Sequence, residues 1–202
     1  MNILCLDLEG VLVPEIWIHV SMHTGIEELQ PTTRDVRDYD ILMKQRLSVL
    51  NRYKITLPDI QAIISDMIPI DGAVEFLEWL RPFFQLAIVS DTFYEFSMPL
   101  MKLLGFPMLF CHHLKTDKTG LITDYFIRQN NAKQQTVGAF QNLGYRVIAA
   151  GDSYNDIAML STADKGFFFR APLSICEEFP QFTSFHTFEE LKEVLEREKD
   201  KA

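Results

Sequence analysis

The fold is decided by residues 1–10, MNILCLDLEG, where a short apolar run ends in two acids and a glycine. At residues 3–8 this pattern is typical of a buried parallel strand that leads into a turn, with Asp7 near the strand's carboxyl end. The run is broken by Asp7 and Glu9, so it is too short for a signal segment or a membrane span. We therefore expect a cytoplasmic protein that has no membrane partner.

Two further apolar runs, at 85–89 and 146–150, also read as strands that end in polar residues. Helical patterns follow at 73–81, 93–104 and 132–143, with Asp71 as a candidate N-cap for the first and glycines closing the other two. This alternation predicts an α/β fold with a Rossmann-like, doubly wound parallel sheet. Ligands of such sheets bind beyond the carboxyl ends of the strands, where Ser90-Asp91-Thr92 and Gly151-Asp152-Ser153 would lie.

Residues 14–68 interrupt the alternation, because they contain helical patterns at 39–53 and 57–67 but no convincing strand. We predict a small helical cap at 14–68, inserted into a catalytic core made of residues 1–13 and 69–202. A hairpin with its turn at 117–120 and a solvated terminal helix at 188–199 are expected in the core.

The composition is that of an ordinary globular protein, with 48% hydrophobic residues and a formal net charge of −9. This charge argues against nucleic acid as a partner, because binding a polyanion requires clustered cations. The three cysteines are widely spaced, which favours neither a zinc site nor a disulfide framework. An acidic protein that binds phosphate would need a metal ion and a few well-placed cations.

Four groups of residues carry the candidate chemistry: Asp7 with Glu9, Ser90 with Asp91, Lys133, and GDSYND at 151–156. Taken singly, each has an ordinary explanation, such as a turn, a helix cap or a surface lysine. Together they supply what phosphoryl transfer requires, namely positioning and electrostatic stabilisation.

The carboxylate of Asp7 is the predicted nucleophile, which would form an aspartyl phosphate. Mg²⁺ is the predicted cofactor, held by Asp7 and Asp152 with Glu9 as a further candidate ligand. Ser90 can donate a hydrogen bond to a phosphoryl oxygen and Lys133 can supply positive charge. Glu9 is the predicted general acid and base, a role that requires its pKa to be raised above about 4.3.

These residues resemble the four ordered motifs of the haloacid dehalogenase superfamily, at Asp7, Ser90, Lys133 and Asp152. Within it, the chain is most similar to the bifunctional phosphoserine phosphatase/homoserine phosphotransferase proteins, which share the strings DLEGVLVPE, DYD-LMKQRL, SDTFYEFS and RVIAAGDSYND. The resemblance covers nearly the whole chain. It implies O-phospho-L-serine as substrate, homoserine as a second phosphoryl acceptor, and a homodimer.

The resemblance also implies the substrate contacts. Glu15 would hold the ammonium group and Arg46 the carboxylate of a small phosphorylated amino acid, as a zwitterion requires. Asn155 and Asp91 would contact substrate or phosphate, and Asp156 would orient the loop that carries Asp152. Spacing alone favours the ordinary explanations, in which Glu15 begins a helix and Arg46 is an exposed cation, and the resemblance reverses this preference.

Two departures from the superfamily pattern stand out: Glu9 replaces the usual second aspartate, and Val11 replaces a hydroxyl residue. Two alternative functions remain open at this point, a phosphatase for another small phosphomonoester and a receiver-like regulatory module. A joint metal role for the adjacent residues His112 and His113 is not expected, because neighbours on a strand point to opposite faces. Trp17 and the triplet 167–169 are expected to serve packing.

Overall fold

The computed structural model describes residues 1–36 and 38–201, which contain a seven-stranded sheet with the strand order β4-β3-β2-β1-β5-β6-β7. Every neighbouring pair in this part of the chain is parallel except β3 and β4. The predicted α/β fold is confirmed. The strands are β1 (Asn2–Leu6), β2 (Gln85–Phe93), β3 (Met108–Thr116), β4 (Ile122–Phe126), β5 (Arg146–Gly151), β6 (Lys165–Phe169) and β7 (Thr183–Phe185).

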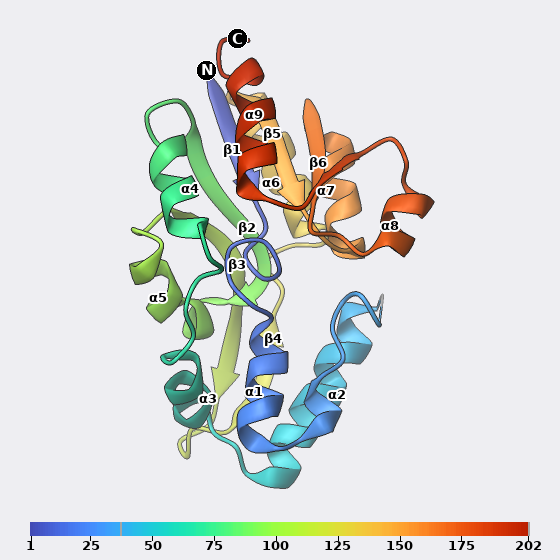
Figure 1. The fold of residues 1–202 in the computed structure, drawn as a ribbon. Coiled ribbons are helices and arrows are strands. Elements are labelled where there is room, and N and C mark those ends of the chain that lie inside the picture. The colour runs from blue at the N-terminus through green and yellow to red at the C-terminus, as the bar shows by residue number, and fades with distance from the viewer. Residues whose placement is uncertain (37, 202) are drawn as a thin grey trace.

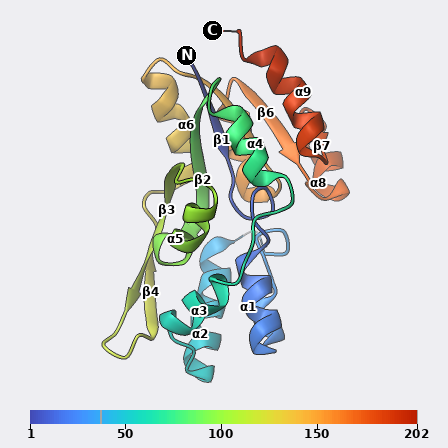
Figure 2. The ribbon, with the colours of Figure 1, turned by 60° about the vertical axis from the view of Figure 1, so that its left-hand side comes forward.

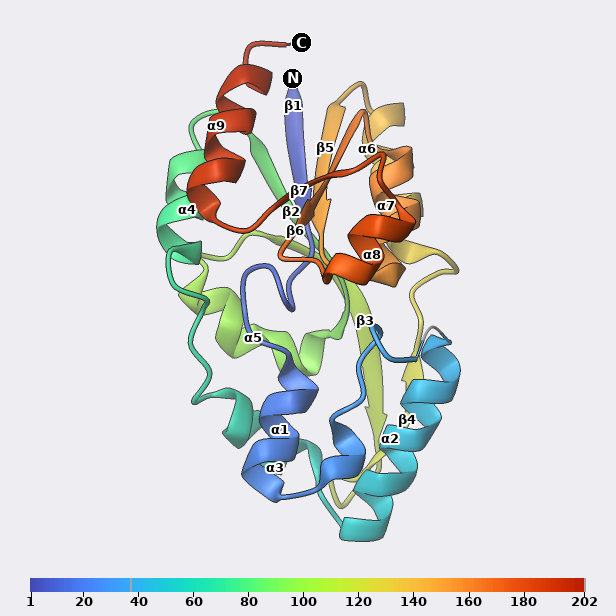
Figure 3. The same ribbon diagram turned by 45° about the vertical axis from the view of Figure 1, so that its right-hand side comes forward.

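Both faces of the sheet are buried, as the alternating side chains of β1 show. Leu4 and Leu6 pack into one hydrophobic cluster, whereas Ile3 and Cys5 pack into another on the opposite face. Figure 3 shows the two helical layers on either side of the sheet. One layer contains α4 (Ala73–Leu80), α5 (Tyr94–Leu103) and α9 (Phe188–Glu198), and the other α6 (Ala132–Asn142), α7 (Ile157–Thr162) and α8 (Leu173–Glu178).

Helix α9 is not the solvated helix that the sequence suggested. Phe188, Leu191 and Leu195 are buried, and the ring of Phe188 stacks on Phe76 of α4 with a centroid distance of 4.8 Å. Most residues of this segment are charged and lie on its other faces. The apolar stripe that packs on the sheet is therefore hard to recognise in the sequence.

Between β1 and α4 the regular elements of the described chain are helices joined by loops: α1 (Ile16–Thr24), the 3₁₀ turn η1 (Glu27–Leu29), α2 (Tyr39–Tyr53) and α3 (Leu57–Ile64). Asp38 caps α2 by accepting from the N–H of Ile41, and Thr56 caps α3 in a capping box with Asp59. These helices form a lobe beyond the carboxyl ends of the strands (Figure 1). The division into a core and a cap at residues 14–68 stays a prediction.

The predicted hairpin is present as β3 and β4, with a turn in which Gly120 N–H donates to Asp117 O at 3.1 Å. The hairpin extends beside the helical lobe (Figure 2). Leu57 N–H donates to Gly120 O at 2.8 Å, so the start of α3 is tied to the hairpin turn.

Two boundaries differ from the expectation. Strand β2 does not end at Val89 but continues through Ser90 to Phe93, with an irregular register between Val89 and Phe93 in its pairing with β3. Helix α4 is capped by Gly72, whose φ of 84° suits glycine, and not by Asp71. Strands β6 and β7 were not predicted. Among the described helices, none is both long and apolar enough to cross a bilayer.

Candidate active site

The site forms where the strand order reverses at β1, which lies between β2 and β5. Asp7 N–H donates to Ala150 O at 3.0 Å. This bond extends the pairing between β1 and β5 by one residue and places Asp7 at the carboxyl ends of the strands. A cavity opens here, and every site residue predicted from the sequence except Asp156 lines it. It is also lined by residues that the prediction missed: Trp17, Thr32, Thr33, Tyr39, Thr92 and Ser153.

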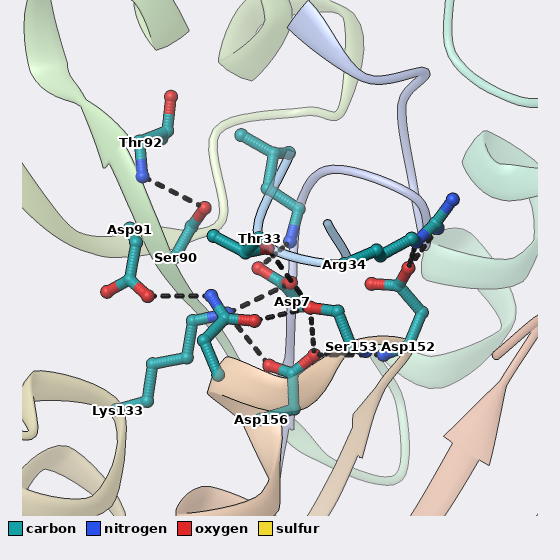
Figure 4. Close-up of polar contacts among 12 residues, drawn as sticks. Asp7, Thr33, Arg34, Ser90, Asp91, Thr92, Lys133, Asp152, Ser153 and Asp156 are labelled. Atoms are coloured by element: carbon teal, nitrogen blue, oxygen red, sulfur yellow. Dashed lines mark hydrogen bonds and ion pairs between the residues drawn. The ribbon is translucent and has the colours of Figure 1, made fainter. Parts of the chain in front are cut away.

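Asp7 is part of a buried group of charges with Lys133 and Asp156 (Figure 4). Lys133 Nζ lies 2.9 Å from Asp7 Oδ2 and 2.7 Å from Asp156 Oδ1. Burial, and then the charge of Asp156, raise the pKa of Asp7 well above its usual range, while Lys133 opposes this. Burial alone would lower the pKa of Lys133, but the two carboxylates raise it, so the lysine stays charged beside Asp7.

Asp156 is hydrogen-bonded to the loop after β5. Its Oδ2 accepts from the N–H groups of Asp152 at 2.9 Å and Ser153 at 3.0 Å, while Oδ1 accepts from Lys133. Gly151 makes this possible, because a Cβ there would lie 2.3 Å from Asp156 Cγ. The loop therefore presents Asp152 to the cavity in a fixed position.

Asp7, Asp152 and Asp156 each offer a carboxylate oxygen within 4.8 Å of the others, and all three are buried. Hard oxygen donors of this kind suit Mg²⁺, so the donor set fits the predicted ion. Burial and the charge of Asp156 raise the pKa of Asp152 to about 7. An ionised carboxylate buried beside another one is stable only when positive charge lies nearby. Arg34 supplies part of it: its Nε donates to Asp152 Oδ2 at 2.8 Å.

Glu9 does not belong to this carboxylate group, although we predicted it as a metal ligand. Its Oε2 accepts from the N–H of Ile16 at 2.9 Å, so the side chain turns toward the start of α1. Burial raises the pKa of Glu9, the direction that a general acid requires.

The two predicted substrate contacts lie in the same cavity. Burial, and then the charge of Glu9, raise the pKa of Glu15 to about 7, and Arg34 Nη2 lies 3.7 Å from its Oε1. Arg46 is 5% exposed and is not the surface cation that spacing alone suggested. Its guanidinium stacks on Trp17 at 4.5 Å, so Trp17 shapes the site as well as packing in the core.

Ser90 accepts a hydrogen bond from Thr92 N–H at 3.3 Å, which leaves its own proton free to point into the cavity. Asp91 directs its carboxylate elsewhere: it accepts from Asn155 Nδ2 at 2.6 Å and contacts His112 Nε2 at 3.2 Å. Both carboxylate oxygens of Asp91 therefore have hydrogen-bond partners. A phosphate would have to contact this residue through its backbone.

His112 is fixed in one tautomer. Arg128 N–H donates to its Nδ1 at 3.2 Å, so the ring proton is on Nε2 and is donated to Asp91. His112 is 2% exposed whereas His113 is exposed, as expected for neighbours on a strand.

Comparison with known proteins assigns the family, because residues 1–164 match the model of the haloacid dehalogenase-like hydrolases. The chain belongs to the haloacid dehalogenase-like hydrolase family. The resemblance drawn from its motifs is thereby confirmed.

Relatives within this family are close. A phosphoserine phosphatase from Pseudomonas syringae pv. tomato is 59% identical over 192 residues, which cover 95% of this chain and 81% of the relative. The phosphoserine phosphatase ThrH from Pseudomonas aeruginosa is 57% identical, with coverage of 95% and 94%. A solved phospho-aspartyl intermediate analogue of phosphoserine phosphatase has the same fold, with a TM-score of 0.81, 20% identity and coverage of 96% and 98%.

Several residues that the sequence analysis missed contribute to this haloacid dehalogenase-like site. Arg34 lies in a loop with no helical or strand pattern, and His112 was considered only as a metal ligand. Tyr39 donates from its hydroxyl to Asp91 O at 2.6 Å. A signal for Thr92 was present, since it follows Ser90 by two residues on a strand and shares its face.

Proposed function

We propose that the chain is a Mg²⁺-dependent phosphatase that hydrolyses O-phospho-L-serine through an aspartyl phosphate on Asp7, and that homoserine can replace water as acceptor. The observation that carries the proposal is one cavity in which Asp7 and Lys133 lie beside Glu15 and Arg46. A phosphoryl-transfer centre and a pair of opposite charges suited to a zwitterion thus share one space. The names of the two Pseudomonas relatives support the substrate.

In the first step a carboxylate oxygen of Asp7 attacks phosphorus, the P–O bond to the serine oxygen breaks, and the departing oxygen takes a proton from Glu9. In the second step a water oxygen attacks phosphorus, Glu9 takes a proton back, and the acyl phosphate bond to Asp7 breaks. Phosphate leaves and the carboxylate of Asp7 is restored. Homoserine in place of this water would yield a phosphorylated homoserine.

Ser90 and Lys133 stabilise the phosphoryl oxygens by hydrogen bonding and charge during both steps. Asp7 and Asp152 would hold Mg²⁺, which when bound supplies the charge that offsets repulsion between Asp7 and the phosphate. Glu15 and Arg46 hold the amino acid part of the substrate, so its ester oxygen is directed toward Glu9.

The test is release of phosphate from O-phospho-L-serine by the wild type, with Mg²⁺ and with EDTA. We expect Mg²⁺-dependent turnover that is lost in Asp7→Asn and kept in Asp71→Asn, a matched change at an exposed aspartate. Adding homoserine should yield its phosphate ester. Turnover that survives in Asp7→Asn would contradict the mechanism.

A receiver-like module would behave differently, because it would accumulate a long-lived aspartyl phosphate and release little phosphate. Activity on other phosphomonoesters without activity on O-phospho-L-serine would contradict the substrate while keeping the role of Asp7. A reaction with homoserine that gives only free phosphate would limit the chain to hydrolysis.

A further inference from the structure

Two buried donors in the active-site cavity lack a hydrogen-bond partner: the hydroxyl of Thr92 and Nε of Arg46. Thr92 is 3% exposed and Arg46 is 5% exposed. A buried donor without a partner destabilises the folded state, because it has lost its water and gained nothing in exchange. Orphaned donors that face a cavity therefore indicate a ligand group that accepts hydrogen bonds.

Thr92 is held on the cavity side of β2. Ser90 lines the same cavity two residues earlier, whereas Asp91 between them turns its carboxylate to His112 and Asn155. The Thr92 hydroxyl lies close enough to Glu9 to favour the ionised form of that carboxylate, but without the geometry of a hydrogen bond. Its proton is therefore available to a bound molecule.

Arg46 keeps donors for a ligand, because within the described part of the chain only two of its five N–H groups have partners. Its Nη2 already donates to Pro31 O at 2.9 Å and its Nη1 contacts Met43 Sδ at 3.7 Å, while Trp17 fixes the plane of the guanidinium. Nε remains without a partner. A carboxylate has two oxygens with about four lone-pair sites, so it can accept from a neutral hydroxyl as well as from the guanidinium.

We infer that Thr92 is a specificity-determining residue whose hydroxyl donates a hydrogen bond to the carboxylate of the substrate, beside the charge of Arg46. The inference rests on the proposed function, in which the substrate is an O-phosphorylated amino acid. The ammonium end is served by the anion Glu15, and the phosphoryl end by Ser90 and Lys133. The carboxylate is the part of the substrate that keeps lone pairs for a neutral donor beside Arg46.

The test compares O-phospho-L-serine with O-phosphoethanolamine, which keeps the phosphoester and the ammonium group but has no carboxylate. Thr92→Val removes the hydroxyl and keeps the shape of the side chain. We expect kcat/KM for O-phospho-L-serine to fall about 10- to 100-fold, as for loss of one hydrogen bond to a charged group, mainly through KM. Activity on O-phosphoethanolamine should change by less than about twofold, and Thr92→Ser should restore most of the loss.

The thermal midpoint of the variants provides an independent readout. Removing a hydroxyl that has no partner and removing one that is hydrogen-bonded should change this midpoint in opposite directions. Thr92→Val removes an orphaned polar atom, so its thermal midpoint in EDTA without substrate should equal or exceed that of the wild type. Thr136→Val is the matched control: its hydroxyl donates to Ala132 O at 2.8 Å and accepts from Arg128 at 2.6 Å. That variant should lose stability and keep the wild-type ratio between the two substrates.

Equal losses on both substrates in Thr92→Val would overturn the inference, since the hydroxyl would then serve Glu9 or the phosphoryl group. A wild type that prefers O-phospho-L-serine, with a Thr92→Val variant that keeps this preference, would overturn the role of Thr92 alone. A wild type that turns over both compounds equally well would overturn the proposed substrate and the role of Thr92 together.

Discussion

Replacing Lys133 by methionine removes the cation that two buried carboxylates share. Lys133 Nζ lies 2.9 Å from Asp7 and 2.7 Å from Asp156, and all three side chains are almost fully buried. At an effective dielectric constant of about 20, each contact is worth roughly 6 kcal/mol before desolvation is subtracted. Breaking such a buried group typically costs about 3–5 kcal/mol of the free energy of unfolding.

The loss in Lys133→Met should depend on pH. Without the lysine, the folded-state pKa of Asp7 rises further above its unfolded value of about 4, so the folded state binds a proton that the unfolded state has released. The free energy of unfolding of the variant must then fall as pH rises from 5.5 to 8. Its deficit relative to the wild type should be larger at pH 8.

Urea unfolding at both pH values, with EDTA present, measures this deficit. Lys102→Met, at an exposed lysine of α5, is the control and should change the free energy of unfolding by less than about 0.5 kcal/mol. A deficit of Lys133→Met below about 1 kcal/mol at pH 8, or one that is equal at both pH values, would refute the electrostatic account.

Two further predictions concern Mg²⁺ and His112. Because burial raises the pKa of Asp152 to about 7, protons should compete with the ion, and the Kd for Mg²⁺ should rise about fivefold from pH 7 to pH 6; calorimetric titration that finds one Kd at both pH values would contradict this. His112→Ala frees the carboxylate of Asp91 and should lower kcat/KM about tenfold, whereas His112→Gln, which keeps an N–H near Nε2, should lose less. A His112→Ala variant with wild-type kinetics would show that Asp91 needs no such support.

Much of the fold could be predicted from the sequence, because the central strands are apolar runs that end in polar residues. The strand that precedes Asp7 and the helix at 39–53 follow directly from such patterns. Strand β6 was missed because its apolar run, FFF, is shorter than the runs that predicted the other parallel strands, and β7 because three residues carry too little signal. The apolar stripe of α9 was hidden among its charges.

The candidate site was predicted less completely, for a physical reason. Residues such as Asp7 and Lys133 follow from the order of motifs, because each lies at a strand end or helix start. The position of Arg34 depends on how its loop folds back onto Asp152. The role of Thr92 depends on which hydroxyl groups find hydrogen-bond partners in the folded chain. Asp91 could be placed in the site, but its bonds to His112 and Asn155 could be seen only in three dimensions.

The helical segment leaves and rejoins the core at neighbouring points, since Ile70 N–H donates to Leu12 O at 2.9 Å. An insertion whose two ends meet can be lengthened, exchanged or trimmed during evolution without displacing a single strand of the sheet. Mutations in this segment, which carries Glu15 and Arg46, can therefore accumulate in one part of the gene without moving Asp7 from its place at the end of β1.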